Sequence, residues 1–177
     1  MIISRISDTD NDNVASHGPI SKGLDAAFPD ISLNVTVESH RLALSHWLEV
    51  KGDGKLPARA DLNLALLAPI LPQIVLLDVK RDPLDFVYRI IGDKLLSHFT
   101  ENYSGKALSE ISGKGPGTNV FENLANIATI AQPRIQGIPY VGPNRDFVRI
   151  ESLALPLASD HEKIDKIMIV VEFIAST

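Results

Sequence analysis

Two short apolar runs separated by a polar turn constrain the fold of this chain more than any other feature. The runs, residues 74–79 and 86–91, are rich in β-branched and aromatic residues, which are typical of strands. Residues 80–85, between them, contain an Asp-Pro step that favours a turn. The pattern predicts an antiparallel hairpin. We expect one face of it to pack on helices and the other to be covered by a further helix or a second subunit.

A helix is predicted on the N-terminal side of the hairpin. In residues 37–50, Leu44, Trp47 and Leu48 recur at helical spacing, and Gly52 ends the pattern. Trp47 is expected to anchor the core from this helix, and a stacking platform for a ligand is the alternative. The residues before this helix, 1–34, are polar and weakly patterned, so they are interpreted as a poorly ordered leader.

The link between this helix and the hairpin carries two further candidates. Asp61 precedes an apolar segment, 62–67, and is predicted to be its helix N-cap. Arg59 lies between two alanines, and we expect it to form an ion pair or a carbonyl clamp that ties the leader helix to the sheet. A contact with an anion or a partner is the alternative for Arg59. Three residues are thus candidates for a partner contact or a structural clamp: Trp47, Arg59 and Asp61.

After the hairpin the chain predicts two helices and three strands. Gly92 ends the second run, and residues 93–99 and 119–131 have helical spacing. Alternating apolar residues then predict strands at 134–141, 147–158 and 167–174. Residues 113–117, Gly-Lys-Gly-Pro-Gly, follow no strand and lack the Gly-Lys-Ser/Thr ending of a phosphate loop, so they are interpreted as a flexible linker.

This order of elements resembles a PAS sensor domain. The features that carry the resemblance are the hairpin, Gly92, the small helices, the Gly105-Lys106 step, the long helix and the three final strands. The segment 56–61, Leu-Pro-Ala-Arg-Ala-Asp, with Trp47 upstream, resembles small bacterial proteins that consist of a divergent PAS domain and are largely of unknown function. The resemblance covers about residues 38–174. It implies an α+β domain over 35–177, with a leader helix at 37–50 and a core at 56–174. The expected core is a PAS-like five-stranded antiparallel sheet with helices packed on one face, and an N-terminal helix is expected in addition to it.

The resemblance also implies a function. We expect a non-catalytic sensory or regulatory module in bacterial signalling that binds a small molecule, a signalling protein partner, or both. The alternative is a pure protein-interaction (dimerisation) domain with a filled core and no ligand. A homodimer is expected through the leader helix and the outer sheet face, because PAS domains commonly associate there and the apolar strands offer more surface than one helix covers.

Composition argues against several classes of partner. The net charge of −5 argues against a general affinity for nucleic acid, whose phosphates favour cationic surfaces. No apolar run approaches the roughly 20 residues that cross a bilayer, so no membrane partner is expected. A cytoplasmic protein is the resulting expectation.

No cofactor, metal or catalytic set is predicted. The chain has no cysteine, which excludes the flavin photochemistry that some PAS domains perform. Haem-binding PAS domains use a histidine in the long helix, and residues 119–131 contain none. The five histidines show no metal-binding spacing, and no Gly-x-Ser-x-Gly motif is present.

Any ligand is expected between the sheet and the helices at 93–99 and 119–131. Helices that follow the hairpin must cover one sheet face, and Gly92 and Gly105 let the chain close over it. Tyr88 and Tyr103 bring hydroxyls that can orient a ligand, while the others supply apolar contact. The predicted wall residues are Leu77, Tyr88, Phe99, Tyr103, Phe121, Leu124, Leu155 and Ile169. A fully packed core built from the same residues is the alternative.

Overall fold

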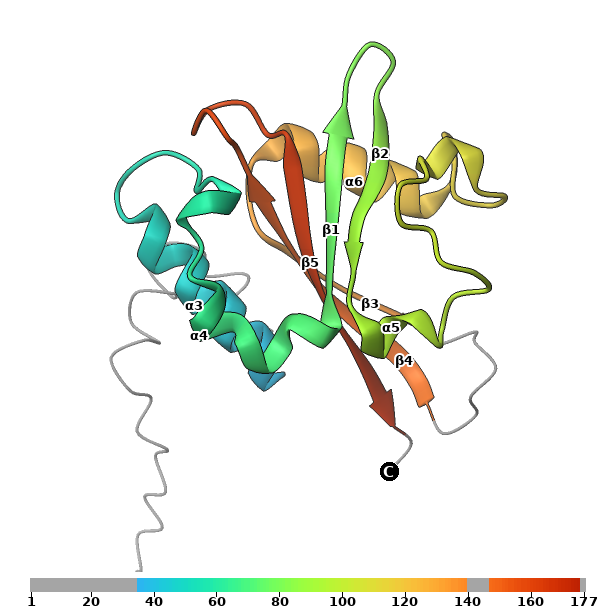
Figure 1. The fold of residues 1–177 in the computed structure, drawn as a ribbon, viewed down its shortest axis with the longest axis horizontal. Helices are drawn as coiled ribbons and strands as arrows, with labels where there is room; N and C mark the ends of the chain where they lie inside the picture. The colour runs from blue at the N-terminus through green and yellow to red at the C-terminus, as the bar shows by residue number, and fades with distance from the viewer. Residues whose placement is uncertain (1–34, 140–146, 176–177) are drawn as a thin grey trace, which may run out of the picture.

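The computed structural model describes residues 35–139 and 147–175, which form an α+β domain (Figure 1). Five antiparallel strands lie in the order β2-β1-β5-β4-β3. They are β1 (Ile74–Lys80), β2 (Asp85–Ile91), β3 (Arg134–Pro139), β4 (Phe147–Leu157) and β5 (Lys166–Ala175). The predicted fold class is confirmed, and the strands lie close to their expected bounds. The predicted leader at 1–34 and the last residues expected in the third strand lie outside the described residues.

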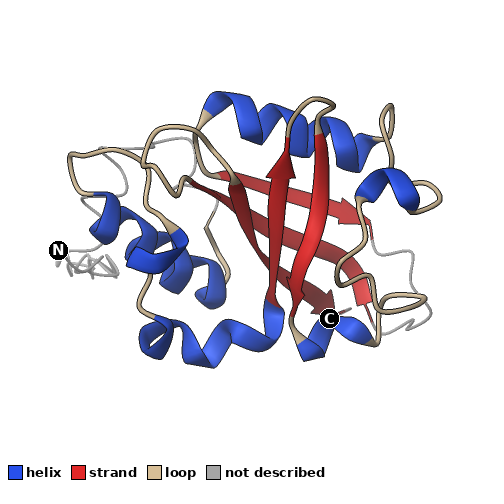
Figure 2. Ribbon diagram, turned by 45° about the horizontal axis from the view of Figure 1, so that its top comes forward, coloured by secondary structure: helices blue, strands red, loops and turns tan. Residues whose placement is uncertain are grey.

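Helical segments surround the sheet (Figure 2). They are α3 (Glu38–Lys51), η1 (Arg59–Asp61), α4 (Leu64–Leu67), η2 (Ala68–Gln73), α5 (Asp93–Leu96), η3 (Leu108–Glu110) and α6 (Asn119–Ile130), where η denotes a 3₁₀ helix. Thr118 caps α6, because its hydroxyl accepts a hydrogen bond from the backbone N–H of Phe121. None of the described helices is long and apolar enough to cross a membrane.

The strand register assigns side chains to two faces of the sheet. Leu77 pairs with Tyr88 in β2 and with Ile167 in β5, so these residues share one face, the inner face. Leu155 in β4 pairs with Met168, which alternates with Ile167 and therefore lies on the opposite, outer face. Each face can then be followed across the sheet by alternation along the strands.

Different helices cover these two faces. From α6, the ring of Phe121 packs edge-on against the ring of Phe86 on the inner face, with centroids 5.2 Å apart. From α3, the hydroxyl of Ser39 donates to Glu172 Oε1 on the outer face at 3.1 Å. Since α3 packs on β4 and β5, the N-terminal helix lies across the sheet from α6.

Trp47 is the centre of the contact between α3 and the outer face. Its side chain is fully buried, and its indole N–H donates to the carbonyl of Pro156 at 2.9 Å. Leu153, Leu155 and Leu157 of β4 are also fully buried. This burial supports the expected role of Trp47 as a core anchor, because a buried indole needs an acceptor as well as apolar neighbours.

A β-bulge corrects the face assignment in β2. Simple alternation along 86–91 predicts that Ile91 shares a face with Arg89 and that Ile90 shares a face with Tyr88. In the register, Leu76 pairs with Ile90 while Leu77 pairs with Tyr88, so Arg89 is an extra residue. Ile91 therefore lies on the inner face, and Ile90 lies on the outer face with 47% of its surface exposed.

The predicted helix cap at Asp61 is wrong by two residues. Asp61 ends η1, and its carboxylate accepts a hydrogen bond from the backbone N–H of Ala58 at 2.8 Å. The N-cap of α4 is Asn63, whose Oδ1 accepts from the N–H of Ala65 at 3.0 Å. Both residues are good capping types, so the sequence offered two candidates within one turn.

Candidate functional site

Three aromatic side chains gather on the inner face, where the chain leaves β2. Tyr88, Phe99 and Tyr103 form this aromatic cluster. The ring of Tyr88 stacks on that of Tyr103 with centroids 5.8 Å apart, and Phe99 meets the two tyrosines edge-on at 6.1 and 5.4 Å. The predicted helix over 93–99 ends at Leu96, so Phe99 reaches the cluster from the segment after α5.

The backbone holds the returning segment against β2. The N–H of Gly105 donates to the carbonyl of Tyr88 at 2.7 Å, and the N–H of Tyr88 donates to the carbonyl of Lys106 at 3.0 Å. Gly105 has φ +86°, a left-handed conformation that glycine adopts readily. The chain therefore turns back along the strand edge and places the ring of Tyr103 on that of Tyr88.

Lys114 brings a positive charge to this cluster. Its ammonium lies 5.8 Å from the ring centroids of both Phe99 and Tyr103, a distance at which cation–π attraction operates. The side chain is half-buried, and the ammonium has no carboxylate or hydrogen-bond partner among residues 35–139 and 147–175. Burial lowers the pKa of Lys114. By contrast, Lys106 near the same Tyr103 ring is paired with Glu101 at 2.8 Å.

The two tyrosine hydroxyls differ in their bonding. The Tyr103 hydroxyl lies 2.6 Å from the hydroxyl of Thr100 and shares a hydrogen bond with it. The Tyr88 hydroxyl has no hydrogen-bond partner within the part of the chain that the structure describes. Burial, reinforced by the neighbouring Tyr103, raises the pKa of Tyr88 to about 12. At neutral pH, Tyr88 is therefore a protonated hydrogen-bond donor in the aromatic cluster.

The other predicted wall residues divide between the two faces. Leu77 and Ile169 lie on the inner face, and Phe121 and Leu124 approach it from α6. Leu155 does not join them, because its pairing with Met168 places it on the outer face under α3. The prediction that Leu155 lines the inner space is therefore wrong. Alternation along β4 separates the faces correctly, but the strand pattern alone does not say which face meets which helix.

The clamp expected at Arg59, between the leader helix and the sheet, is not formed to any described residue. Asp61 accepts from the backbone of Ala58, and its carboxylate lies 3.6 Å from Nδ1 of His161. Within the described ranges, the side chain of Arg59 makes no hydrogen bond or ion pair. The expected tie between the leader helix and the sheet is supplied by Trp47 and Ser39.

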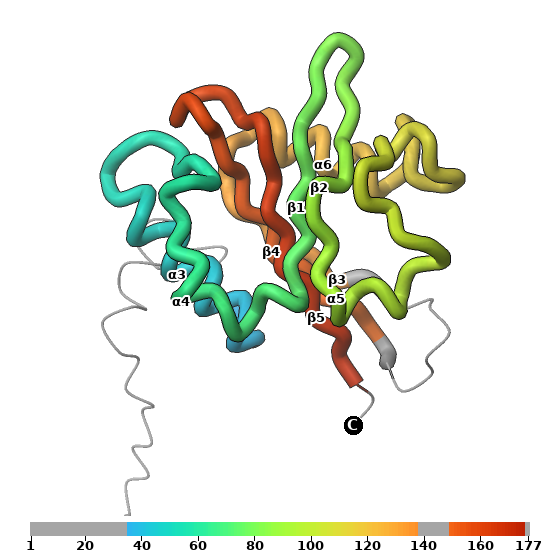
Figure 3. The backbone as a smooth tube through the Cα atoms, in the orientation of Figure 1, coloured from blue at the N-terminus to red at the C-terminus, as the bar shows by residue number. Residues whose placement is uncertain are grey.

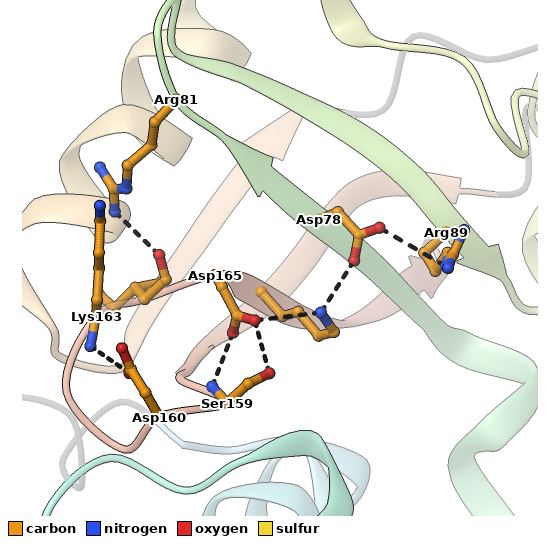
Figure 4. Close-up of polar contacts among 9 residues, drawn as sticks. Asp78, Arg81, Arg89, Ser159, Asp160, Lys163 and Asp165 are labelled. Carbon is orange, nitrogen blue, oxygen red and sulfur yellow. Dashed lines mark hydrogen bonds and ion pairs between the residues drawn. The ribbon is translucent and has the colours of Figure 1, made fainter.

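A surface cavity of about 330 Å³ lies away from the aromatic cluster, between the end of β1 and the turn that joins β4 to β5. We call it the turn cavity. Its lining residues are Val79, Lys80, Arg81, Ser159, Asp160, Lys163, Ile164 and Asp165. Figure 4 shows that hydrogen bonds connect the two walls and the turn itself.

No metal centre is apparent in the described ranges. No group of three or more histidine and carboxylate side chains there lies in an arrangement that could hold a metal ion. The aromatic cluster offers ring faces, a hydroxyl donor and an ammonium. These groups suit an organic ligand with a planar body and a hydrogen-bond acceptor.

The fold and the inner face define a class of small α+β domains in which α6 and the segments after β2 cover the inner face of a five-stranded antiparallel sheet, while α3 packs on its outer face. A model of the PAS domain family matches residues 35–171, and the chain therefore belongs to that family. Among solved structures, a sensory box sensor histidine kinase from Vibrio cholerae is similar, with 15% identity and a TM-score of 0.45 over 64% of this chain and 93% of that chain. A comparison with curated protein sequences finds no match.

Sequence reasoning missed several charged residues at these sites. Lys114 lies in the Gly-rich segment interpreted as a linker, and Arg81 and Lys163 lie in polar turns. The sequence did not single these residues out, because charged residues are common in turns and give no distinctive pattern there. A signal was present only at Lys114, a single cation among glycines that follows the predicted aromatic wall.

Proposed function

We propose that this chain is a non-catalytic sensory or regulatory module in signalling that binds a small molecule at the aromatic cluster. PAS domains are generally non-catalytic sensory modules. Two observations support a ligand here: the Lys114 ammonium lies 5.8 Å from the rings of Phe99 and Tyr103 without a carboxylate or hydrogen-bond partner among the described residues, and the Tyr88 hydroxyl of the same cluster also has no described hydrogen-bond partner. Partial burial of a charged ammonium costs free energy when no acceptor compensates for the lost water. A bound ligand with a hydrogen-bond acceptor would supply that compensation.

Mass spectrometry of the full chain, purified under native conditions, tests this proposal. We expect a co-purified small molecule, and we expect Lys114→Met and Tyr88→Phe to lose it while remaining folded. Lys106→Met is the matched control, because Lys106 approaches the same ring but is paired with Glu101. Absence of any bound molecule from the unmodified protein, or equal loss in the control, contradicts the proposal.

A second candidate function is a protein-interaction domain with a filled core. Its support is the packing between α6 and the sheet, where Phe121 contacts Phe86 and Leu124 is only 5% exposed. Leu124→Trp distinguishes the two candidates. In a filled core it overpacks and lowers the free energy of unfolding by ~1–3 kcal/mol, whereas an open space tolerates it and loses ligand uptake.

The matched control for that substitution is Val120→Trp on the same helix, where the side chain is 38% exposed. Strong destabilisation by Leu124→Trp, together with no co-purified molecule, would favour the interaction domain over the ligand-binding module. Destabilisation with a molecule still present would place the ligand at the aromatic cluster alone.

A further inference from the structure

We propose that the turn cavity is a second site, which binds the phosphate group of a small phosphorylated molecule. Its volume of about 330 Å³ is at the lower end of the range for small-molecule sites. None of its lining residues belongs to the aromatic cluster. Binding here is therefore independent of the ligand proposed above.

The walls of the turn cavity are held together by backbone and side-chain hydrogen bonds. The N–H of Val79 donates to the carbonyl of Asp165 at 2.8 Å, and the N–H of Asp165 donates to the carbonyl of Leu157 at 3.1 Å. Arg81 Nη2 spans the cavity walls and donates to the carbonyl of Ile164 at 3.0 Å. The site is thus formed before a ligand arrives, which reduces the entropy lost on binding.

Both carboxylates that line the cavity are already engaged by the turn itself. Asp160 accepts from the backbone N–H groups of Glu162 and Lys163 at 2.9 and 2.8 Å, and these bonds lower its pKa. Asp165 accepts from the N–H and hydroxyl of Ser159 at 3.0 and 2.6 Å. Burial opposes ionisation of Asp165, yet the Ser159 bonds and Lys166 hold its pKa below the usual range.

The cationic side chains of the turn cavity form no ion pair with a carboxylate among the described residues, although the charge of Lys163 helps to lower the pKa of Asp160. Among the described residues, the ammonium groups of Lys80 and Lys163 form no ion pair or hydrogen bond, and the guanidinium of Arg81 uses one donor on a neutral carbonyl. Figure 4 shows Lys163 extending toward the guanidinium of Arg81, with Asp160 and Asp165 turned to their own partners. Three cationic side chains and two carboxylates line the cavity, so its net charge is positive and favours an anion.

A phosphate group fits these donors better than a carboxylate does. The planar guanidinium of Arg81 can hold two phosphate oxygens, and the two ammonium groups can donate to the third and to shared oxygens. The apolar floor of Val79 and Ile164, both under 10% exposed, offers contact to the body of a small ester. The small volume excludes an extended peptide or polynucleotide from the cavity.

Amide NMR shifts of the full chain, titrated at constant ionic strength, test this proposal. The probes are inorganic phosphate, phenyl phosphate and benzoate. We expect saturable shifts at residues 79–81 and 159–165 with both phosphates and weaker binding of benzoate. Tighter binding of phenyl phosphate identifies an organic ester as the ligand class, and equal binding identifies free phosphate.

Lys163→Gln and Lys80→Gln supply the decisive comparison, because neither ammonium stabilises the fold through a hydrogen bond or ion pair to a described residue. Each substitution should weaken phosphate binding roughly tenfold, since it removes a charge-assisted hydrogen bond. Lys106→Gln, whose ammonium is paired with Glu101, should leave binding unchanged. Absence of saturable shifts, or equal weakening in the Lys106 control, overturns the proposal.

Discussion

Trp47 and Arg59 are both singled out by the sequence, yet their surroundings differ completely. Trp47 is fully buried and donates to the carbonyl of Pro156 at 2.9 Å. We expect Trp47→Phe to lower the free energy of unfolding by ~1–3 kcal/mol, because it leaves that buried carbonyl without its donor and leaves a small void. Arg59→Gln should change it by less than ~0.5 kcal/mol. Urea unfolding of both variants checks the contrast, and a large loss at Arg59 would contradict the placement of its side chain.

His40 gives the fold a dependence on pH at the residue scale. Its ring is buried and its Nε2 donates to the carbonyl of Val170 at 3.1 Å in the neutral form. Burial lowers the pKa of His40, and the Val170 carbonyl and the carboxylates of Glu151 and Glu172 only partly oppose this. The unfolded chain therefore takes up the proton first as the pH falls. Stability is complete above the ordinary pKa of 6.5 and declines as the pH falls toward the folded-state value.

His40→Gln, which keeps a side-chain donor, should remove this part of the acid sensitivity. Urea midpoints measured at pH 7.5 and 5.5 for the unmodified protein and the variant check the prediction. Comparing the change in urea midpoint between the two pH values, for the unmodified protein and for the variant, separates the effect of His40 from that of the other titrating groups. An identical change in midpoint in both proteins would show that His40 is not responsible for the loss of stability in acid.

Gly92 governs how two elements approach each other. A side-chain carbon at position 92 would lie 2.8 Å from the carbonyl oxygen of Leu71 and closer still to that of Pro72 in η2. The φ of Gly92 is −59°, so close approach and not backbone conformation requires glycine here. Gly105, by contrast, needs glycine for its positive φ.

Gly92→Ala should therefore separate η2 from α5 and destabilise the domain by ~1–3 kcal/mol or more. Gly137→Ala in β3 is the control, because nothing lies within 4 Å of the added carbon and φ is not positive there. Thermal melts of the two variants measure the difference. Equal melting temperatures would show that η2 can shift without loss of stability.

At the scale of the whole molecule, the outer face is covered unevenly. Figure 3 shows that α3 lies on the side of β4 and β5, away from β2. On the outer side of β2, Ile90 is 47% exposed. We propose that a second copy of the chain covers this part of the sheet, as in the dimer expected from the sequence. Burial of such apolar surface stabilises association.

Ile90→Glu should then convert a dimer to a monomer, because it places a charge in the contact. Light scattering at high concentration measures the mass, and Val120→Glu on α6 is a control with similar exposure. A dimer that survives Ile90→Glu, or an unmodified protein that is monomeric, would exclude this surface as the interface.

The sequence alone determined the strands, the hairpin and α6, because each depends on a periodicity within a few residues. The PAS order of elements followed from these, and the family match confirms it. The residues of the aromatic cluster were also among those predicted, because apolar side chains on a strand face that helices cover are expected to pack under those helices.

Tertiary structure alone decided the rest. The bulge at Arg89 exchanged the faces of Ile90 and Ile91, and packing under α3 placed Leu155 on the outer face. The turn cavity joins residues near 80 and 160, and Lys114 reaches the rings from a segment interpreted as a linker. These placements depend on strand register and on contacts between segments that are distant in the sequence. A local sequence pattern contains no information about either.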